Sequence, residues 1–183
     1  MIIRDATLSD LTGITSIYTG SVVDGVASYE LVAPDVAEME RRMAAITGSG
    51  YPYLIAAAGD GTVLGYAYAS AFRTRPAYRW LVEDSIYLAP EARGQGVGRA
   101  LLDALIGRCE TLGFRQMVAV IGGADPASIA VHHKAGFVHC GMISGAGHKH
   151  GRWLDTVFMQ RPLGAGKATD PDPLSYQGTL FSR

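Results

Sequence analysis

One stretch of the chain, residues 80–121, limits the fold more than any other. Trp80–Leu88 alternates like a strand, a glycine-rich turn follows, and a helical pattern then runs to Gly113. The apolar side of that helix consists of Leu101, Leu102, Leu105 and Ile106. Met117–Ile121 is a continuous apolar run, which is typical of a strand inside a sheet. The order of strand, helix and strand predicts a mixed α/β sheet.

The flanking segments continue this alternation. Strand patterns lie at 2–4, 54–58, 63–69, 138–143 and 154–159, helix patterns at 8–18, 35–46 and 125–135, and loops at 25–34 and 144–153. We therefore expect an α/β fold with a mixed central sheet of about 6–7 strands and helices on both faces. Residues 1–163 form one domain in this prediction. Residues 164–183 show no periodicity and are expected to be a C-terminal extension.

Composition excludes several classes of protein. The 183 residues are 48% apolar and 18% charged, which is unlike a disordered chain, and the net charge of −1 offers no field for nucleic acid. No apolar run approaches the roughly 20 residues of a membrane span, and the first residues do not resemble a secretory signal. Cys109 and Cys140 form no C-x-x-C motif, so two free, buried thiols in the cytoplasm are expected. We expect neither nucleic acid nor membrane as a partner.

The five histidines fall between residues 132 and 150, which invites a metal-binding interpretation. Their spacing argues against it, because there is no H-E-x-x-H motif and no paired cysteines join them. No metal is expected.

Glycine is over-represented, at 23 of 183 residues or about 13%, and one cluster of it has the setting of a ligand site. Arg93–Ala100 reads R-G-Q-G-V-G-R-A and lies between a strand and a helix. Glycines there let backbone N–H groups approach an anion, and the helix N-terminus adds positive potential. Neither a P-loop nor a dinucleotide fingerprint fits the spacing. A turn without any ligand is the alternative.

The pattern Arg93-x-x-Gly96-x-Gly98 after a strand resembles the acyl-CoA pyrophosphate loop of the GNAT-type N-acetyltransferases. Further blocks are similar to the phosphinothricin and methionine sulfoximine N-acetyltransferase branch: Gly50-Tyr-Pro-Tyr-Leu, Gly65-Tyr-Ala-Tyr-Ala, Val82-Glu-Asp-Ser-Ile-Tyr, Val118-Ala-Val-Ile-Gly and Gly151-Arg-Trp-Leu-Asp. The resemblance covers about residues 2–163. It implies a GNAT fold and acetyl-CoA as co-substrate.

The implied activity is direct transfer of acetyl, within a ternary complex, to the primary amine of a small amino-acid-like substrate. Phosphinothricin, methionine sulfoximine and methionine sulfone are the substrate types of that branch. Two alternatives stay open: a protein N-terminal or lysine acetyltransferase, and a non-catalytic acyl-CoA sensor.

The resemblance implies that Glu83 is the general base. A carboxylate within an apolar strand is costly unless it is paired or functional, and an attacking amine must lose a proton. Alternation places Glu83 on the strand face opposite Asp84. The alternative is a salt bridge to Arg73, Arg75 or Arg79.

His132 occupies the position where the wider superfamily usually has the tyrosine that protonates the departing thiolate. Imidazole can donate a proton near neutral pH, so we expect His132 to be the acid. An exposed helix histidine is the alternative, and it is the preferred interpretation for His133.

Cofactor contacts are expected from the glycine turn and the end of the preceding strand, where a backbone N–H at Tyr87 or Leu88 would polarise the thioester. The candidates are Tyr87, Leu88, Arg93, Gly94, Gln95, Gly96, Val97, Gly98, Arg99, Ala100 and Asp125. Asp125 departs from the asparagine common in the family, and with Pro126 behind it a simple helix cap is equally open.

Substrate contacts are expected near Glu83 and in the basic connection before it. The candidates are Tyr29, Phe72, Arg73, Arg75, Arg79, Asp84 and Ser85. The arginines suit bidentate binding of carboxylate or phosphinate oxygens, or else form a solvated loop, and the aromatics line the pocket or belong to the core. Lys149–Trp153 resembles a late hairpin of the branch that reaches a neighbouring subunit, so a homodimer is expected.

Overall fold

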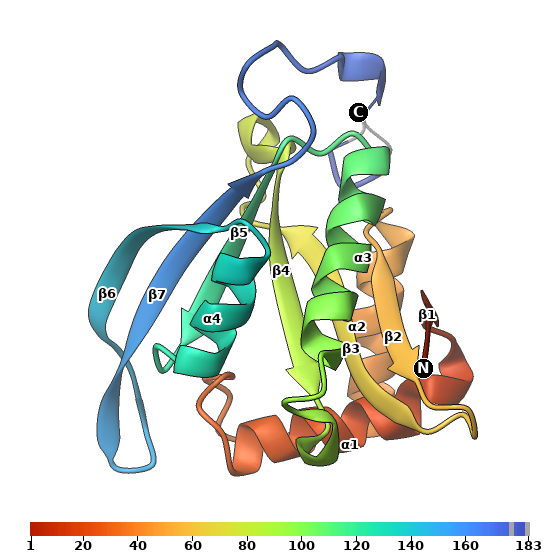
Figure 1. Ribbon diagram of the computed structural model, residues 1–183, viewed down its shortest axis with the longest axis vertical. Helices are drawn as coiled ribbons and strands as arrows, with labels where there is room; N and C mark the ends of the chain where they lie inside the picture. The colour runs from red at the N-terminus through yellow and green to blue at the C-terminus, as the bar shows by residue number, and fades with distance from the viewer. Residues whose placement is uncertain (176–177, 182–183) are drawn as a thin grey trace.

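The computed structural model describes residues 1–175 and 178–181, and within them a seven-stranded sheet carries four α-helices (Figure 1). The strands are β1 (Ile2–Asp5), β2 (Tyr53–Ala57), β3 (Val63–Ala71), β4 (Leu81–Leu88), β5 (Gln116–Gly122), β6 (Val138–Lys149) and β7 (Arg152–Pro162). The helices are α1 (Leu11–Val23), α2 (Val36–Gly48), α3 (Val97–Thr111) and α4 (Pro126–Lys134). The strand order is β1-β2-β3-β4-β5-β7-β6. Only the β4–β5 pair is parallel among these neighbours, so the sheet is mixed, as predicted.

Helices cover both faces of the sheet, which confirms the predicted arrangement. Consecutive residues of β4 point to opposite faces. The ring of Tyr87 packs edge-on against Tyr18 of α1 at 5.0 Å, whereas Leu88 lies against Gly98 of α3. In Figure 1, α3 and α4 lie in front of the sheet and α2 lies behind it. One face of β4 therefore belongs to α1, and the other belongs to α3 and α4.

The side of α3 that the spacing predicts to be apolar forms the centre of the core. Leu101, Leu102 and Leu105 are fully buried, and Ile106 is nearly so. Burying each leucine contributes roughly 1.5–3 kcal/mol, enough to position α3 firmly against β2, β3 and β4. The start of α3, and with it the glycine turn, is fixed by this packing.

The last two strands differ from the prediction. Residues 144–153 were expected to be a loop, but β6 and β7 continue through most of them as a long hairpin that turns at His150 and Gly151. The pairing register shifts between Ile143 and Gly147, so the glycines form an irregularity within the ladder. Gly147 has a packing reason as well, because a Cβ there would lie 2.7 Å from the ring of Tyr29. The same hairpin corrects the prediction for Cys140, which is exposed, while Cys109 is buried and both are free.

The segment after β7 packs on the far end of the sheet. Arg115, just before β5, donates from Nε to the carbonyl oxygen of Gly166 and from Nη2 to that of Thr169, both at 2.8 Å. The hydroxyl of Thr179 donates to the carbonyl oxygen of Gly48 at the end of α2. These contacts lie at the opposite end of β4 and β5 from the glycine turn (Figure 1).

No helix in the described part of the chain is both long enough and apolar enough to cross a membrane.

Candidate active site

Two parallel strands separate at the centre of the sheet. The β4–β5 ladder runs from the Leu81–Gln116 pair to the Asp84–Ala119 pair, but β4 continues to Leu88 and β5 to Gly122 (Figure 1). Beyond Asp84, β4 is paired only with β3, and β5 only with β7. The facing edges of both strands are therefore available to hydrogen-bond a ligand chain that enters between them.

The geometry of β4 distinguishes the two backbone candidates at this edge. The N–H of Ala89 donates to the carbonyl oxygen of Leu64, at 3.0 Å. N–H groups alternate in direction along an antiparallel strand, so the N–H of Tyr87 turns toward β3 and that of Leu88 turns toward the separated side. Leu88 is the residue of the two whose N–H can polarise a carbonyl there.

The glycine turn presents backbone to solvent in front of α3. Gly94 and Gly96 have φ values of +73° and +82°, and a Cβ at either would meet no atom within 4 Å. Gly98 has a different task, because a Cβ there would lie 3.1 Å from the Leu88 side chain. The first N–H groups of α3 have no intrahelical acceptor, and this open cradle fits a pyrophosphate.

The polar side chains predicted to bind cofactor in this turn bond within the chain. Arg93 donates to the carbonyl oxygen of Leu88 at 3.5 Å, and Gln95 to that of Glu91 at 2.5 Å. Arg99 donates to Asp103 and to the carbonyl oxygen of Lys134, both at 2.7 Å. Val97 is buried and Ala100 half-buried. The turn offers its backbone N–H groups to an anion, and the exposed side chains of Arg93, Gln95 and Arg99 stay predicted cofactor contacts.

Glu83 lies half-buried on the α1 face of β4, at the point where the strands separate. The pKa of its carboxyl group is raised to about 7, chiefly by desolvation and further by the neighbouring Asp84 charge, while Arg73 opposes the shift. Within residues 1–175 and 178–181, no ion pair joins Glu83 to Arg73, Arg75 or Arg79, so the predicted salt-bridge alternative is wrong. A carboxyl group with this pKa can exchange a proton at neutral pH.

Asp84 faces the other side of the sheet and does not reach the Glu83 side, contrary to the expected substrate contact. Its side chain is 1% exposed and its Oδ2 lies 3.0 Å from Nε2 of His132, which is itself 2% exposed. The physical reason is the alternation of the strand, which turns the residue after Glu83 toward α3 and α4. The interpretation of His132 as an exposed helix residue is wrong as well, whereas His133 is exposed as expected.

The basic connection between β3 and β4 lies near Glu83, and within the described chain Arg73 donates to the carbonyl oxygen of Phe72 at 2.9 Å. Arg73 is exposed, sits 4.3 Å from the centroid of the Phe72 ring and is the arginine whose charge lowers the pKa of Glu83. Arg79 stacks over Trp80 at 5.1 Å, and Arg75 is exposed at the start of a short 3-10 helix.

Phe72 also lines an apolar groove of about 370 Å³ together with Leu81, Val118 and Phe158. Leu81 lies two residues from Glu83, and Val118 is its partner across the ladder, so this groove lies on the Glu83 side of the sheet. A larger hollow, of about 660 Å³, lies elsewhere, between α1 and the Ala89–Arg93 segment, and does not include Glu83.

Tyr29 and Asp125 both have structural partners. The Tyr29 hydroxyl lies 2.8 Å from the hydroxyl of Thr156, donates to the carbonyl oxygen of Asp155 and accepts from the N–H of Gly123. Tyr29 therefore ties the α1–α2 loop to the β6–β7 hairpin and to the end of β5. Asp125 caps α4 by accepting from the N–H groups of Ala127 and Ser128, so the helix-cap interpretation is confirmed.

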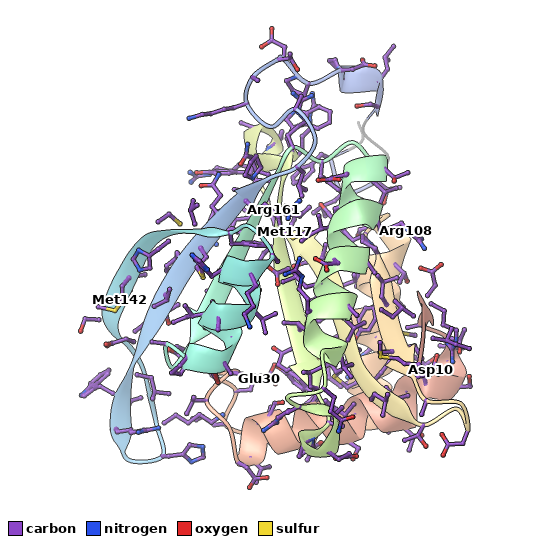
Figure 2. The ribbon with its side chains drawn as sticks, viewed as in Figure 1. Asp10, Glu30, Arg108, Met117, Met142 and Arg161 are labelled. Atoms are coloured by element: carbon purple, nitrogen blue, oxygen red, sulfur yellow. The ribbon has the colours of Figure 1, made fainter. Side chains whose placement is uncertain are left out.

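The sequence reasoning missed the polar and aromatic lining on the α1 side. Tyr68 is stacked with Tyr53 and Tyr66, lies opposite Ser85 in the β3–β4 ladder and lies near Glu83. Glu30, labelled on the α1–α2 loop in Figure 2, accepts from the Tyr18 hydroxyl and pairs with Arg42 of α2. The alternation of Tyr66 and Tyr68 along β3 was the available signal. Ser85 thus lies on the predicted face.

Fold and site together fit an acyltransferase that uses a CoA thioester, because an open glycine turn and a carboxyl group with a raised pKa lie beside the separated parallel strands. The profile of the Acetyltransferase (GNAT) domain matches residues 3–158. The chain therefore belongs to the GNAT acetyltransferase family, it is an acetyltransferase, and acetyl-CoA is its co-substrate.

Within this family, the chain is similar to acetyltransferases with named amino-acid-like substrates. The chain is 50% identical, over 93% of its length and 85% of the relative's, to phosphinothricin N-acetyltransferase of Alcaligenes faecalis. It is 40% identical to L-methionine sulfoximine/L-methionine sulfone acetyltransferase of Pseudomonas paraeruginosa, over 88% of this chain and 94% of that one. The crystal structure of a GNAT superfamily phosphinothricin acetyltransferase from Sinorhizobium meliloti, in complex with acetyl-CoA, is similar with a TM-score of 0.96 and 60% identity. That match covers 100% of this chain and 98% of the other.

Among the described residues, no group of three or more His, Cys, Asp or Glu side chains is arranged to hold a metal ion.

Proposed function

We propose that this protein acetylates the primary amine of a small amino-acid-like substrate of the phosphinothricin, methionine sulfoximine or methionine sulfone type. The names of the relatives support this substrate class. The observation that carries the proposal is Glu83, a half-buried carboxyl group whose pKa is raised to about 7 beside the separated strands. The apolar groove next to it suits the side chain of such a substrate.

Acetyl-CoA supplies the thioester whose acetyl group is transferred. Glu83 takes the proton of the substrate amine, directly or through water, as the amine attacks. The N–H of Leu88 stabilises the oxygen of the attacked carbonyl, and removing such a donor typically costs about 3 kcal/mol of transition-state stabilisation. The first turn of α3 and the backbone of Gly94 and Gly96 hold the pyrophosphate. Arg73 is the best placed arginine for the substrate's acidic group, because its charge already acts on Glu83.

His132 remains the proposed acid for the departing thiolate, with a condition that the geometry sets. Its Nε2 faces Asp84, and its Nδ1 lies 2.7 Å from the carbonyl oxygen of Ser128. An imidazole N–H lies in the plane of its ring, so protonating the sulfur requires the whole ring to turn and carry its Nε2 proton from Asp84 toward the ligand.

We further propose a homodimer that works in the cytoplasm, where acetylation of a toxic amino-acid analogue would be detoxification. Val138, Met142 and Ile143 are each more than half exposed on the edge strand β6, and Figure 2 shows Met142 at that outer edge. Trp153, 70% exposed, extends this apolar surface onto β7. Exposed apolar residues on a long edge strand favour pairing with a second copy. The catalytic domain is then residues 1–163, and 164–183 is an appended segment.

A thiol-release assay with acetyl-CoA and the three named amines tests the substrate proposal. We expect turnover with at least one of them, and a kcat lowered about 10²–10⁴-fold by Glu83→Gln. Glu40→Gln, an exposed glutamate on α2, is the matched control and should keep full activity.

Two results would contradict the proposal. Acetylation of peptide N-termini or lysines with no activity on the free amino acids would favour the protein acetyltransferase. Calorimetric binding of acetyl-CoA without thiol release across a wide panel of amines would favour the sensor.

A further inference from the structure

One buried carboxyl group, that of Asp84, contacts His132 but transfers no proton in the mechanism above. Asp84 directly follows Glu83 in β4. Its side chain is 1% exposed, and its Oδ1 has no hydrogen-bond partner within the described chain. Its Oδ2 lies 3.0 Å from Nε2 of His132. An aspartate in such a place is costly unless a cation compensates it, so its partner must account for its presence.

The protonation of His132 follows from the acceptors around it. Nδ1 lies 2.7 Å from the carbonyl oxygen of Ser128, which can only accept, so Nδ1 carries a proton. If Nε2 were bare, its lone pair would face the Asp84 carboxylate. With a second proton on Nε2, both nitrogens donate and both acceptors are satisfied. The imidazole ring of His132 also packs edge-to-face with the Phe137 ring, with centroids 5.0 Å apart, and this contact further fixes the orientation of the imidazole.

The surroundings favour the same charge. His132 lies in the last turn of α4, where the helix dipole favours a cation. At the end of α4, Arg99 donates to the carbonyl oxygen of Lys134 and Arg161 donates to that of Ala135. These two positive charges oppose the effect of the helix dipole on His132. On α3, burial and the nearby charge of Asp84 raise the pKa of the Cys109 thiol, so this thiol adds no charge of its own. Burial disfavours the imidazolium, yet Asp84 and the Ser128 carbonyl raise the pKa of His132 above its ordinary value.

The pair lies where the site is assembled. Asp84 is the last β4 residue in the ladder with β5, and His132 comes from α4, the helix that follows β5. The bond thus ties α4 to β4 at the point where the two strands separate. We propose that Asp84 is a positioning residue that holds His132 as an oriented imidazolium beside the site of acetyl transfer. This inference rests on the proposed role of His132, but the protonation of the ring can be measured without catalysis.

The test is an NMR pH titration of the histidine rings in the full-length protein without ligand. The signal of His132 is assigned by its loss in His132→Gln. We expect His132 to stay doubly protonated above pH 6.5, roughly the ordinary pKa of an imidazole. In Asp84→Asn, His132 should instead lose its second proton at a lower pH than in the wild-type protein. A wild-type His132 that is neutral at pH 6.5, or one whose titration does not change in Asp84→Asn, overturns the proposal.

Kinetics separate a positioning role from a merely structural one. We expect Asp84→Asn to lower kcat about 10–100-fold and to change KM for acetyl-CoA by less than about twofold. The pH at which activity falls on the basic side should move down, and Asp84→Glu should restore part of the loss. An unchanged pH profile with lower kcat would contradict the role. If Asp84→Asn does not fold, the wild-type titration still decides, and it does so even if no amine proves to be a substrate.

Discussion

Replacing the proposed base should stabilise the protein while lowering its activity. Desolvation raises the pKa of Glu83 from 4.5 to about 7, so ionising this group costs more in the folded chain than in the unfolded one. The rise in the pKa from 4.5 to about 7 corresponds to a destabilisation of the ionised folded protein by about 3 kcal/mol, at roughly 1.36 kcal/mol for each pH unit. Because the folded pKa is raised, the penalty is absent below pH 4.5, grows as the pH rises and is complete above about 7.

Glu83→Gln removes the charge and keeps the shape, so the variant should escape this penalty. Urea denaturation of both proteins at pH 4 and at pH 8.5 measures the difference. We expect similar free energies of unfolding at pH 4 and a gain of about 3 kcal/mol for the variant at pH 8.5. For a chain of this length that gain corresponds to a Tm higher by roughly 6–12 °C.

The control for this experiment is Glu40→Gln, on the exposed side of α2, which should change stability little at either pH. A variant Glu83→Gln that is less stable at pH 8.5, or a stability difference independent of pH, would refute the reasoning. It would mean that the Glu83 carboxylate has favourable partners in the folded protein and is not strained by burial.

Three further predictions concern stability. Gly107, exposed in the middle of α3 with open space at its Cβ position, should accept alanine with a gain of up to about 1 kcal/mol, seen as a higher Tm; a lower Tm would count against it. Tyr29→Phe should lower the free energy of unfolding by about 1–3 kcal/mol, because the hydroxyl that joins the α1–α2 loop to Thr156 is lost. Limited proteolysis should then cut this loop faster, and an unchanged cleavage rate would contradict the anchoring role. Arg4 lowers the pKa of Asp10 from 3.8 to about 2, and solvent screens this pair because Arg4 is exposed, so Asp10→Asn should lower the free energy of unfolding at pH 7 by only about 1 kcal/mol. That loss should fade as the pH falls from 3.8 through 2, and equal losses at both ends would exclude this ion pair as the cause.

Patterns local in sequence predicted much of this fold. Leu101, Leu102 and Leu105 recur at helical spacing because one side of α3 is buried. The position and the apolar face of this helix could therefore be predicted from the sequence alone. The glycine turn before it was recognisable because positive φ values at Gly94 and Gly96 need glycine. Glu83 stood out because a carboxylate is rare inside an apolar strand.

Contacts between distant residues were not visible in those patterns. The glycines of 144–153 suggested a loop, although Gly147 is there because Tyr29 packs on it from another part of the chain. Asp84 was grouped with Glu83 as a substrate contact, since nothing in the sequence shows that His132 is its partner. Each of these depends on how separate elements meet in space.

The separation of β4 from β5 has a consequence for the cooperativity of the molecule. Strands β1–β4 form one half of the sheet and β5–β7 the other, and among the described residues the ladder that joins them runs from Leu81 to Asp84, with backbone bonds from Arg115 and Gln116 to Trp80 just before it. A ligand that bonds both inner edges would act as an additional strand between the halves. Bound acetyl-CoA should therefore slow amide hydrogen exchange on both strands at once, with the inward-facing N–H of Leu88 among the most affected. Folding and co-substrate binding would then share one interface.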